Sequence, residues 1–150
     1  MYINFWYAAD QSQNITESPV KKKMLGQNFV LYRDTKDKVH CLSDVCVHRG
    51  GSLAGGKIVK DCIQCPYHGW QFNGKGKCQK IPSLGKNTKI PSRVKVDSYP
   101  TKELYGLVFC FLGDLPEKER CPIMKVKEYE QEGWRTTTQY FQFDIDYKRS

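Results

Sequence analysis

The chain has 150 residues and a formal net charge of +8, with 39% hydrophobic, 13% aromatic and 27% charged residues. This length predicts one domain, or one domain and the start of another, and the composition is typical of a soluble globular protein. No apolar run approaches the roughly 20 residues that span a bilayer, and the N-terminus lacks the basic region of a signal peptide. We therefore expect no membrane span and a cytoplasmic location.

The basic charge does not indicate a nucleic-acid-binding protein. Of the 24 basic residues, 18 are lysines spread along the chain, and no helix-turn-helix, zinc-finger array or arginine-rich stripe accompanies them. A dispersed excess of lysine usually serves solubility, and the remaining interpretation is attraction of an acidic protein partner.

In chain order, five short segments rich in β-branched and aromatic residues predict strands. They are residues 27–33, 38–44, 93–100, 103–113 and 134–147. The polar residues between the first two suit a hairpin turn, and the fourth is a nearly continuous apolar strand. The last alternates polar and apolar positions with the period of two expected of a strand. Only residues 125–133 suggest a turn or two of helix.

These elements predict an all-β fold, an antiparallel barrel or sandwich. A glycine-rich stretch at about residues 43–82 interrupts the strands and is interpreted as a loop-rich subdomain that carries the functional site. A second break lies near residues 112–121. We therefore place one domain at residues 1–115, followed by a further segment at residues 116–150.

The sequence contains seven cysteines, and two of them lie close to a histidine, in Cys46-Val-His48 and Cys65-Pro-Tyr-His68. An odd number of cysteines in a chain without an export signal argues against a disulfide framework and for reduced thiols or metal ligands. Each pair is followed by glycine within two residues. Cys110 instead lies in an apolar run and is expected to be a buried apolar residue.

The two pairs admit three interpretations. The four residues could share no role, although the near-repetition argues against this. They could bind zinc, for which Cys62 and Cys65 supply a Cys-x-x-Cys pair. Alternatively, two loops could hold a [2Fe-2S] cluster, one iron through the cysteines and the other through the histidines. Two neutral imidazoles in place of two thiolates remove negative charge, so that an electron is easier to add.

The order Cys-x-His, sixteen residues, Cys-x-x-His resembles the Rieske motif, and CPYHGW is among its more specific strings. By this resemblance, the buried iron is bound by two cysteines and the outer iron by two histidines: Cys46 and Cys65, and His48 and His68.

Rieske proteins of quinol-oxidising complexes carry two further cysteines that bridge the cluster loops. Gly51 and Tyr67 occupy those positions here. The pattern is therefore similar to the low-potential type found in Rieske oxygenases and their ferredoxins.

Nearly the whole chain resembles the N-terminal half of Rieske non-haem iron oxygenase α-subunits, the aromatic-ring-hydroxylating dioxygenases and the vanillate demethylase-like or pheophorbide and chlorophyllide oxygenase-like branch. The matching segments are NFWYAAD (4–10), GQNFVLYRD (26–34), HRGGSLAGG (48–56), CPYHGWQFNGKGKC (65–78), KIPS (80–83) and YGLVFCFLGD (105–114). The resemblance implies a Rieske-type fold for residues 1–115. It also implies that Arg49, Gly69, Trp70 and Pro82 support the cluster loops, although a plain packing, turn or solvated role stays open for each.

These oxygenases carry a second domain with a mononuclear iron, bound by two histidines and a carboxylate. The chain has three histidines, and with two of them assigned to the cluster only His40 is left, which we expect on the surface or in packing. Residues 116–150 are then a linker and the first strand of a missing catalytic domain, and the chain alone is not expected to be catalytically competent.

The implied function is electron transfer from a ferredoxin or flavin reductase, through the Rieske cluster, to the mononuclear iron of an intact oxygenase that acts on an aromatic or related small molecule. Related intact enzymes form trimers. Lys75, Lys77 and Lys80 follow the second loop and could attract an acidic donor. The alternatives are a free-standing Rieske ferredoxin, which is usually shorter, and a zinc-stabilised binding module.

Overall fold

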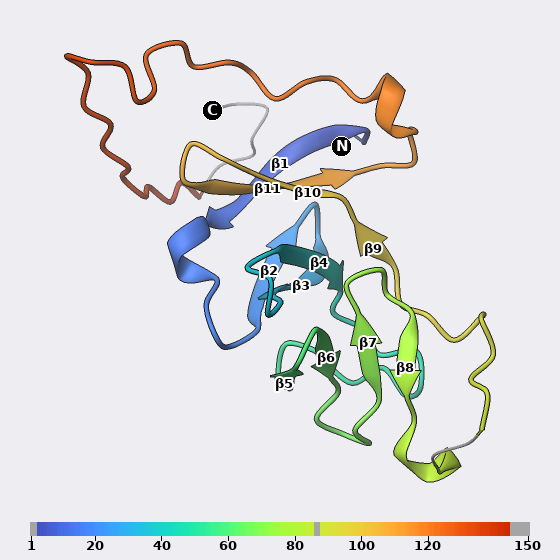
Figure 1. Ribbon diagram of the computed structural model, residues 1–150. Coiled ribbons are helices and arrows are strands. Elements are labelled where there is room, and N and C mark those ends of the chain that lie inside the picture. Colours follow the sequence, from blue (N-terminus) through green and yellow to red (C-terminus); the bar gives the residue numbers. More distant parts are fainter. Residues whose placement is uncertain (1–2, 86–87, 145–150) are drawn as a thin grey trace.

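The structure, a computed structural model, describes residues 3–85 and 88–144 (Figure 1). Within these residues, eleven strands form three antiparallel sheets, with the strand orders β1-β11-β10, β2-β3-β4-β9 and β5-β6-β7-β8. The predicted all-β, antiparallel fold class is thereby confirmed. Among the described residues, no helix has the length and apolarity needed to cross a bilayer.

The strands are short. Two single-turn 3-10 helices lie between them, and a third follows the last strand. The first sheet consists of β1 (Phe5–Gln11), β10 (Thr101–Leu104) and β11 (Leu107–Leu112). The second consists of β2 (Val20–Met24), β3 (Gln27–Arg33), β4 (Val39–Ser43) and β9 (Ser98–Tyr99). The third consists of β5 (Lys57–Val59), β6 (Cys62–Gln64), β7 (Gln71–Asn73) and β8 (Cys78–Lys80). The 3-10 helices are η1 (Ser12–Asn14), η2 (Pro82–Leu84) and η3 (Glu117–Glu119).

Strand β3 lies at the centre of the molecule and is buried on both faces. Phe29 and Leu31 pack into the core shared with β1 and β11, whereas Val30 and Tyr32 pack into the core shared with β5–β8. Side chains alternate between the two faces of a strand, so a strand buried on both faces needs a continuous apolar run. The run FVLY at residues 29–32 meets this need, and β3 thereby joins the cluster-loop subdomain to the rest of the fold.

Side-chain hydrogen bonds to the backbone define two of the hairpin turns. In the β3–β4 turn, Asp34 Oδ1 accepts the N–H groups of Lys36 and Lys38, each at 2.9 Å. In the β7–β8 turn, Asn73 Oδ1 accepts those of Lys75 and Lys77, at 3.0 and 3.1 Å. Asp and Asn commonly begin turns in this way, and the first of these turns is the one predicted between residues 33 and 38.

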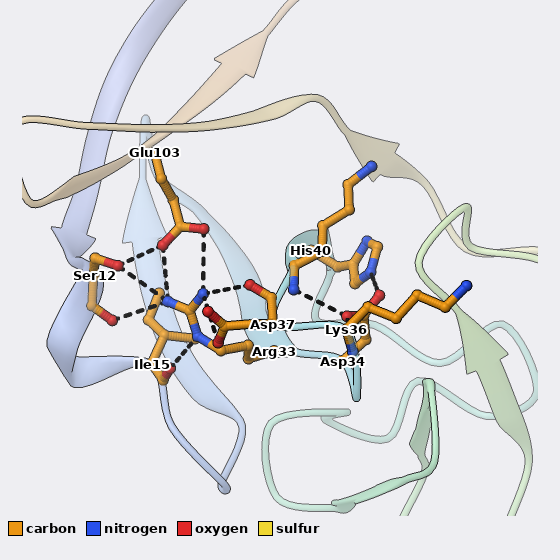
Figure 2. Close-up of polar contacts among 9 residues, drawn as sticks. Ser12, Ile15, Arg33, Asp34, Lys36, Asp37, His40 and Glu103 are labelled. Carbon is orange, nitrogen blue, oxygen red and sulfur yellow. Dashed lines mark hydrogen bonds and ion pairs between the residues drawn. The ribbon is translucent and has the colours of Figure 1, made fainter.

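Arg33, the last residue of β3, connects three segments that are distant in sequence (Figure 2). Its guanidinium donates to the carbonyl oxygens of Ile15 at 2.9 Å and Ser12 at 3.2 Å. It also forms an ion pair with Glu103 of β10 at 2.8 Å. The Arg33 side chain is only 15% exposed. This network fixes η1 and the first sheet against the central sheet.

His40 has a structural place, as expected. Its Nε2 lies 2.8 Å from Asp34 Oδ2 across the β3–β4 hairpin (Figure 2). Its ring fills the space above Gly74, where a Cβ atom would lie 2.1 Å from the ring Nδ1. His40 therefore holds the β7–β8 turn against the central sheet.

The prediction of a single strand at residues 103–113 is wrong, because this segment forms parts of two strands, β10 and β11. Tyr105 and Gly106 have φ angles of +57° and +71° and turn the chain back between β10 and β11. Two-residue hairpin loops with positive φ at both positions match the twist of the flanking strands. The apolar run concealed this turn because Gly106 lies between large apolar residues.

The other C-terminal expectations also need correction. Of residues 93–100, only β9 and an isolated bridge between Lys95 and Lys77 pair as strands. Residues 125–133 form isolated turns and no helix. Residues 134–144 form no strand and are exposed, while residues 145–147 of the predicted strand lie outside the described residues. An alternating pattern yields a strand only where another strand lies alongside to accept its hydrogen bonds.

Sequence inspection also missed strands. It did not identify β1 or β2, and it interpreted the region that contains β5–β8 as mostly loop. The strands β5–β8 are three residues long, too short for an alternating pattern to be recognised. The loop-rich subdomain is therefore a small four-stranded sheet with two loops, one that leads from β4 into β5 and one that joins β6 to β7.

Candidate metal centre

Two loops of like backbone structure carry the Cys/His pairs, one after β4 and the other between β6 and β7. In the first loop, Cys46 N–H donates to Gly51 O at 2.9 Å, and Gly50 N–H donates back to Cys46 O at 2.8 Å. In the second loop, the same two bonds join Cys65 to Trp70 at 2.8 Å and Gly69 to Cys65 at 3.1 Å.

The fourth residue after each cysteine is a glycine with positive φ. The φ angles of Gly50 and Gly69 are +71° and +72°, a backbone region that glycine adopts without steric cost. The repeated Cys-x-x-x-Gly spacing thus builds the same turn twice. This is the local reason why both cysteines face inward from the start of a loop.

The thiols of Cys46 and Cys65 meet at the buried end of the site. Each residue is 2% exposed. Burial raises the pKa of Cys46 to about 11, and the neighbouring Cys65 thiol acts in the same direction. The backbone N–H groups of His48 and Arg49 point at the Cys46 sulfur and oppose this rise in pKa. Such donors stabilise a thiolate, the form that binds metals.

The two imidazoles lie at the outer end of the site. The rings of His48 and His68 are 4.5 Å apart, centroid to centroid, and nearly perpendicular at 72°. His48 is half-buried, His68 is exposed, and the ring of Trp70 stacks on His48 at 4.5 Å and 7°. Desolvation lowers the pKa of His48, with smaller contributions from His68 and Arg49, and this favours the neutral ring that a metal needs.

One atom of this site is conspicuously unsatisfied. His48 Nδ1 is buried and has no hydrogen-bond partner, whereas buried polar atoms in native proteins are normally paired. The residues therefore fit a group that takes sulfur ligands at its buried end and nitrogen ligands at its outer end.

The four residues expected to support the cluster loops all lie next to these loops, and each makes a different contact. Arg49 is exposed and contributes its backbone N–H to Cys46. Trp70 stacks on His48. A Cβ atom on Gly69 would lie 3.1 Å from Pro82 Cγ, so Pro82, the first residue of η2, covers the turn of the second loop.

Two further residues belong to the site: Gly51, which the sequence marked only as the position of a bridging cysteine in other Rieske proteins, and Asp44, which sequence inspection missed. A Cβ atom at Gly51 would lie 3.4 Å from the Cys65 sulfur, so this position is where the first loop approaches the second. Asp44 is buried and accepts hydrogen bonds from the first loop. Asp44 could not be found from a local pattern, because its place in the site depends on its burial and on its partners in the folded chain.

The remaining cysteines lie outside the two loops. All seven are free thiols. Cys110 is fully buried, as predicted, and its hydrogen bond with Cys41, together with burial, raises the pKa of Cys41. Cys62 is half-buried on β6, and Cys121 is half-buried near Asn4.

The sequence is similar to known Rieske proteins over most of its length. The sequence pattern of the Rieske [2Fe-2S] domain matches residues 5–100. The chloroplastic chlorophyllide a oxygenase of Chlamydomonas reinhardtii is 38% identical over 120 residues, which are 79% of this chain and 18% of that protein. The iron-sulfur subunit of the toluene-4-sulfonate monooxygenase system of Comamonas testosteroni is 33% identical over 150 residues, 99% of this chain and 42% of that protein.

Solved structures show the same relationship. The crystal structure of dicamba monooxygenase bound to dicamba superposes with a TM-score of 0.72 at 34% sequence identity, covering 80% of this chain and 36% of that chain. The chain thus spans less than half the length of these relatives. These matches overturn the zinc interpretation and favour the oxygenases over a free-standing ferredoxin. The chain belongs to the Rieske [2Fe-2S] domain family of the non-haem iron oxygenases.

Proposed function

We propose that the chain is an electron-transfer module in which Cys46, His48, Cys65 and His68 hold the Rieske [2Fe-2S] cluster. When bound, such a cluster accepts and returns one electron at a moderate potential. The observation that carries the proposal is the pair of buried thiols next to a buried, unpartnered imidazole nitrogen.

The residues of the site have different roles at its buried end and at its outer end. Cys46 and Cys65 offer thiolates where water is excluded, and two backbone N–H groups offset part of the cost of the Cys46 thiolate. Trp70 fixes the ring plane of His48. His68 is exposed and brings the outer end of the site to the surface, where an electron enters or leaves.

The low-potential type is part of this proposal. Gly51 and Tyr67 occupy the positions of the bridging cysteines in the quinol-oxidising class. A Cβ atom on Gly51 would already touch the Cys65 sulfur, at 3.4 Å, so the loops meet through close packing in place of a covalent bridge.

We further propose that the module passes its electron to the mononuclear iron of an intact oxygenase. That oxygenase would be a trimer and would act on an aromatic or related small molecule. Residues 116–150 would be the linker and the start of that catalytic domain, in which residues 134–144, unpaired among the described residues, would gain a partner strand. Several aromatic residues in this segment support the assignment, since they are 65–81% exposed in the described residues and would become buried against further structure: Trp134, Tyr140, Phe141 and Phe143.

An acidic ferredoxin or flavin reductase is the proposed electron donor. Lys77 and Lys95 lie opposite each other across an isolated bridge, and Lys75 and Lys80 flank them on the β7–β8 hairpin. All four are exposed, and within the described residues none forms an ion pair. Adjacent uncompensated lysines favour an acidic protein surface. Pro82 of η2, two residues after Lys80, packs against Gly69 of the second loop and places these lysines near it.

The donor assignment predicts a salt-dependent reduction rate. Lys77→Glu should slow reduction of the holoprotein by an acidic ferredoxin about tenfold at low ionic strength, and the difference should shrink as salt rises. Stopped-flow bleaching of the visible absorbance measures this rate. Lys118→Glu, on the distant helix η3 (Figure 1), is the control and should have little effect. A rate that does not change with salt would remove this surface from the donor assignment.

The seven free thiols fit a reducing compartment, and we propose the cytoplasm.

Purification with iron and sulfide tests the proposed function directly. The holoprotein should be red-brown, contain two irons and two sulfides per chain, and show an EPR signal only after reduction. A colourless protein that binds one zinc and shows no signal would contradict the proposal.

A further inference from the structure

Asp44 is an unusual residue in this fold. Among the described residues, it is the one charged residue that is buried, at 3% exposure. It lies directly after β4 and two residues before Cys46. A buried carboxylate is costly unless hydrogen bonds and an opposite charge compensate it, so its partners indicate what it does.

Both carboxylate oxygens of Asp44 bind the far side of the first loop. Oδ1 accepts the backbone N–H of Ala54 at 2.7 Å, and Oδ2 accepts the hydroxyl of Ser52 at 2.8 Å. The Asp44 carbonyl also accepts the N–H of Leu53, at 3.4 Å. The loop from residue 45 to residue 54, which contains Cys46 and His48, is thus closed at its base by one carboxylate.

The positive charge that compensates Asp44 belongs to Lys21, which lies on another strand and is exposed at the surface. Lys21 of β2 places its Nζ 3.2 Å from Asp44 Oδ2, and its side chain is 52% exposed while that of Asp44 is 1% exposed. The negative charge is therefore fixed at the base of the loop that carries Cys46 and His48, whereas the positive charge is in contact with solvent. The ion pair makes the electrostatic environment of the first loop depend on a residue outside it.

Among the residues that the structure describes, no charged side chain forms an ion pair or hydrogen bond at the base of the second loop. Gln71 Nε2 donates to Gln64 Oε1 at 2.9 Å across the base of that loop, and Pro82 packs on Gly69. Neutral groups thus suffice to close a loop with the same backbone hydrogen bonds. Loop closure alone therefore does not explain why the first loop uses a carboxylate.

We infer that Asp44 is a positioning residue that also sets the reduction potential of the centre, with Lys21 as its opposing charge. The inference rests on the proposed function, that is, on a cluster bound by Cys46, His48, Cys65 and His68. A negative charge near a redox centre disfavours addition of an electron, and a positive charge favours it. Asp44 should lower the potential and Lys21 should raise it.

Two near-isosteric substitutions separate charge from shape. Asp44→Asn keeps an acceptor for Ala54 N–H and removes the charge, so the midpoint potential should rise. Lys21→Met keeps the aliphatic stem and leaves the hydrogen bonds of the loop in place, so the potential should fall. The fall should be smaller at high salt because Lys21 is half-exposed.

Asp44→Ala tests the positioning role of the carboxylate. It removes both hydrogen bonds of the Asp44 side chain to the loop and should accelerate loss of the cluster to a chelator about 10- to 100-fold.

The chain offers a matched control on the same strand. Lys22 pairs with Asp10 at 2.7 Å, and the Asp10 side chain is 9% exposed, but the hydrogen bonds of Asp10 go to segments away from the cluster loops. Lys22→Met and Asp10→Asn should leave the potential and the cluster lifetime unchanged. Redox titration with EPR detection, and the decay of visible absorbance in chelator, are the two measurements.

The outcomes distinguish this inference from the function on which it rests. A wild-type protein that holds no [2Fe-2S] cluster would contradict the proposed function. If the wild-type protein holds a cluster, two results would overturn the inference and leave the proposed function intact. Either both Asp44→Asn and Lys21→Met have the wild-type potential, or both shift the potential in the same direction. Should Asp44→Asn fail to fold, Lys21→Met decides, because an unchanged potential in that variant contradicts the role of the pair.

Discussion

Cys46→Ser is expected to abolish the cluster. The Cys46 sulfur is buried, faces the Cys65 thiol, and receives the N–H groups of His48 and Arg49. A serine hydroxyl at this depth ionises far less readily than a thiol and is a poorer ligand for iron in a [2Fe-2S] centre. The purified variant should be colourless, with neither the visible absorbance nor the EPR signal of the reduced wild-type protein. Cys65→Ser should behave in the same way.

Cys62→Ser is the matched control for this experiment. Cys62 is three residues from Cys65, is half-buried on β6, and belongs to the Cys-x-x-Cys pair that a zinc site would use. The variant should keep its iron, its sulfide and its EPR signal. Far-UV circular dichroism should show that both variants are folded, because a chain of this length can bury a core without a metal. Retention of the cluster in Cys46→Ser, or its loss in Cys62→Ser alone, would refute the ligand assignment.

Arg33→Met should cost about 3 kcal/mol of unfolding free energy, measured by urea denaturation. The substitution leaves the carbonyl oxygens of Ser12 and Ile15 without their donor and the Glu103 carboxylate without its ion pair. Because the Arg33 side chain is only 15% exposed, water replaces these bonds incompletely. Arg135→Met, at an exposed position, is the control and should change the free energy little. Equal destabilisation by both substitutions would contradict the role of this network.

The same network predicts a dependence on pH. The hydrogen bond from Arg33 lowers the pKa of Glu103, burial opposes this in part, and Ser12 adds to the lowering. A carboxyl group whose pKa is lower in the folded state contributes stability above its unfolded pKa, and this contribution is lost as the pH falls through the folded pKa. The stability difference between wild type and Arg33→Met should therefore be full at neutral pH and shrink below about pH 4. A difference that stays constant down to about pH 3 would show that the Glu103 charge contributes nothing.

The two loops of the candidate site, and the proximity of their Cys and His residues, could be predicted from the sequence because the determinants are local. Cys46 and His48 lie in one short segment, and Cys65 and His68 lie in another. Each segment also contains the glycine that follows its cysteine by four residues. Local hydrogen bonds then shape each loop in the same way. Asp44 escaped prediction because its importance depends on burial and on Lys21, which is more than twenty residues away in the chain.

For the fold, the sequence by itself determined the all-β class, the central strand β3 and the turn at Asp34, since each follows from residue type and immediate neighbours. Only the tertiary structure decided which segments found a partner strand. Residues 107–112 pair with both β1 and β10, whereas residues 134–144 carry an equally regular pattern and pair with nothing among the described residues. The reason is that a strand is completed by hydrogen bonds from another segment, and the identity of that segment is a property of the folded chain.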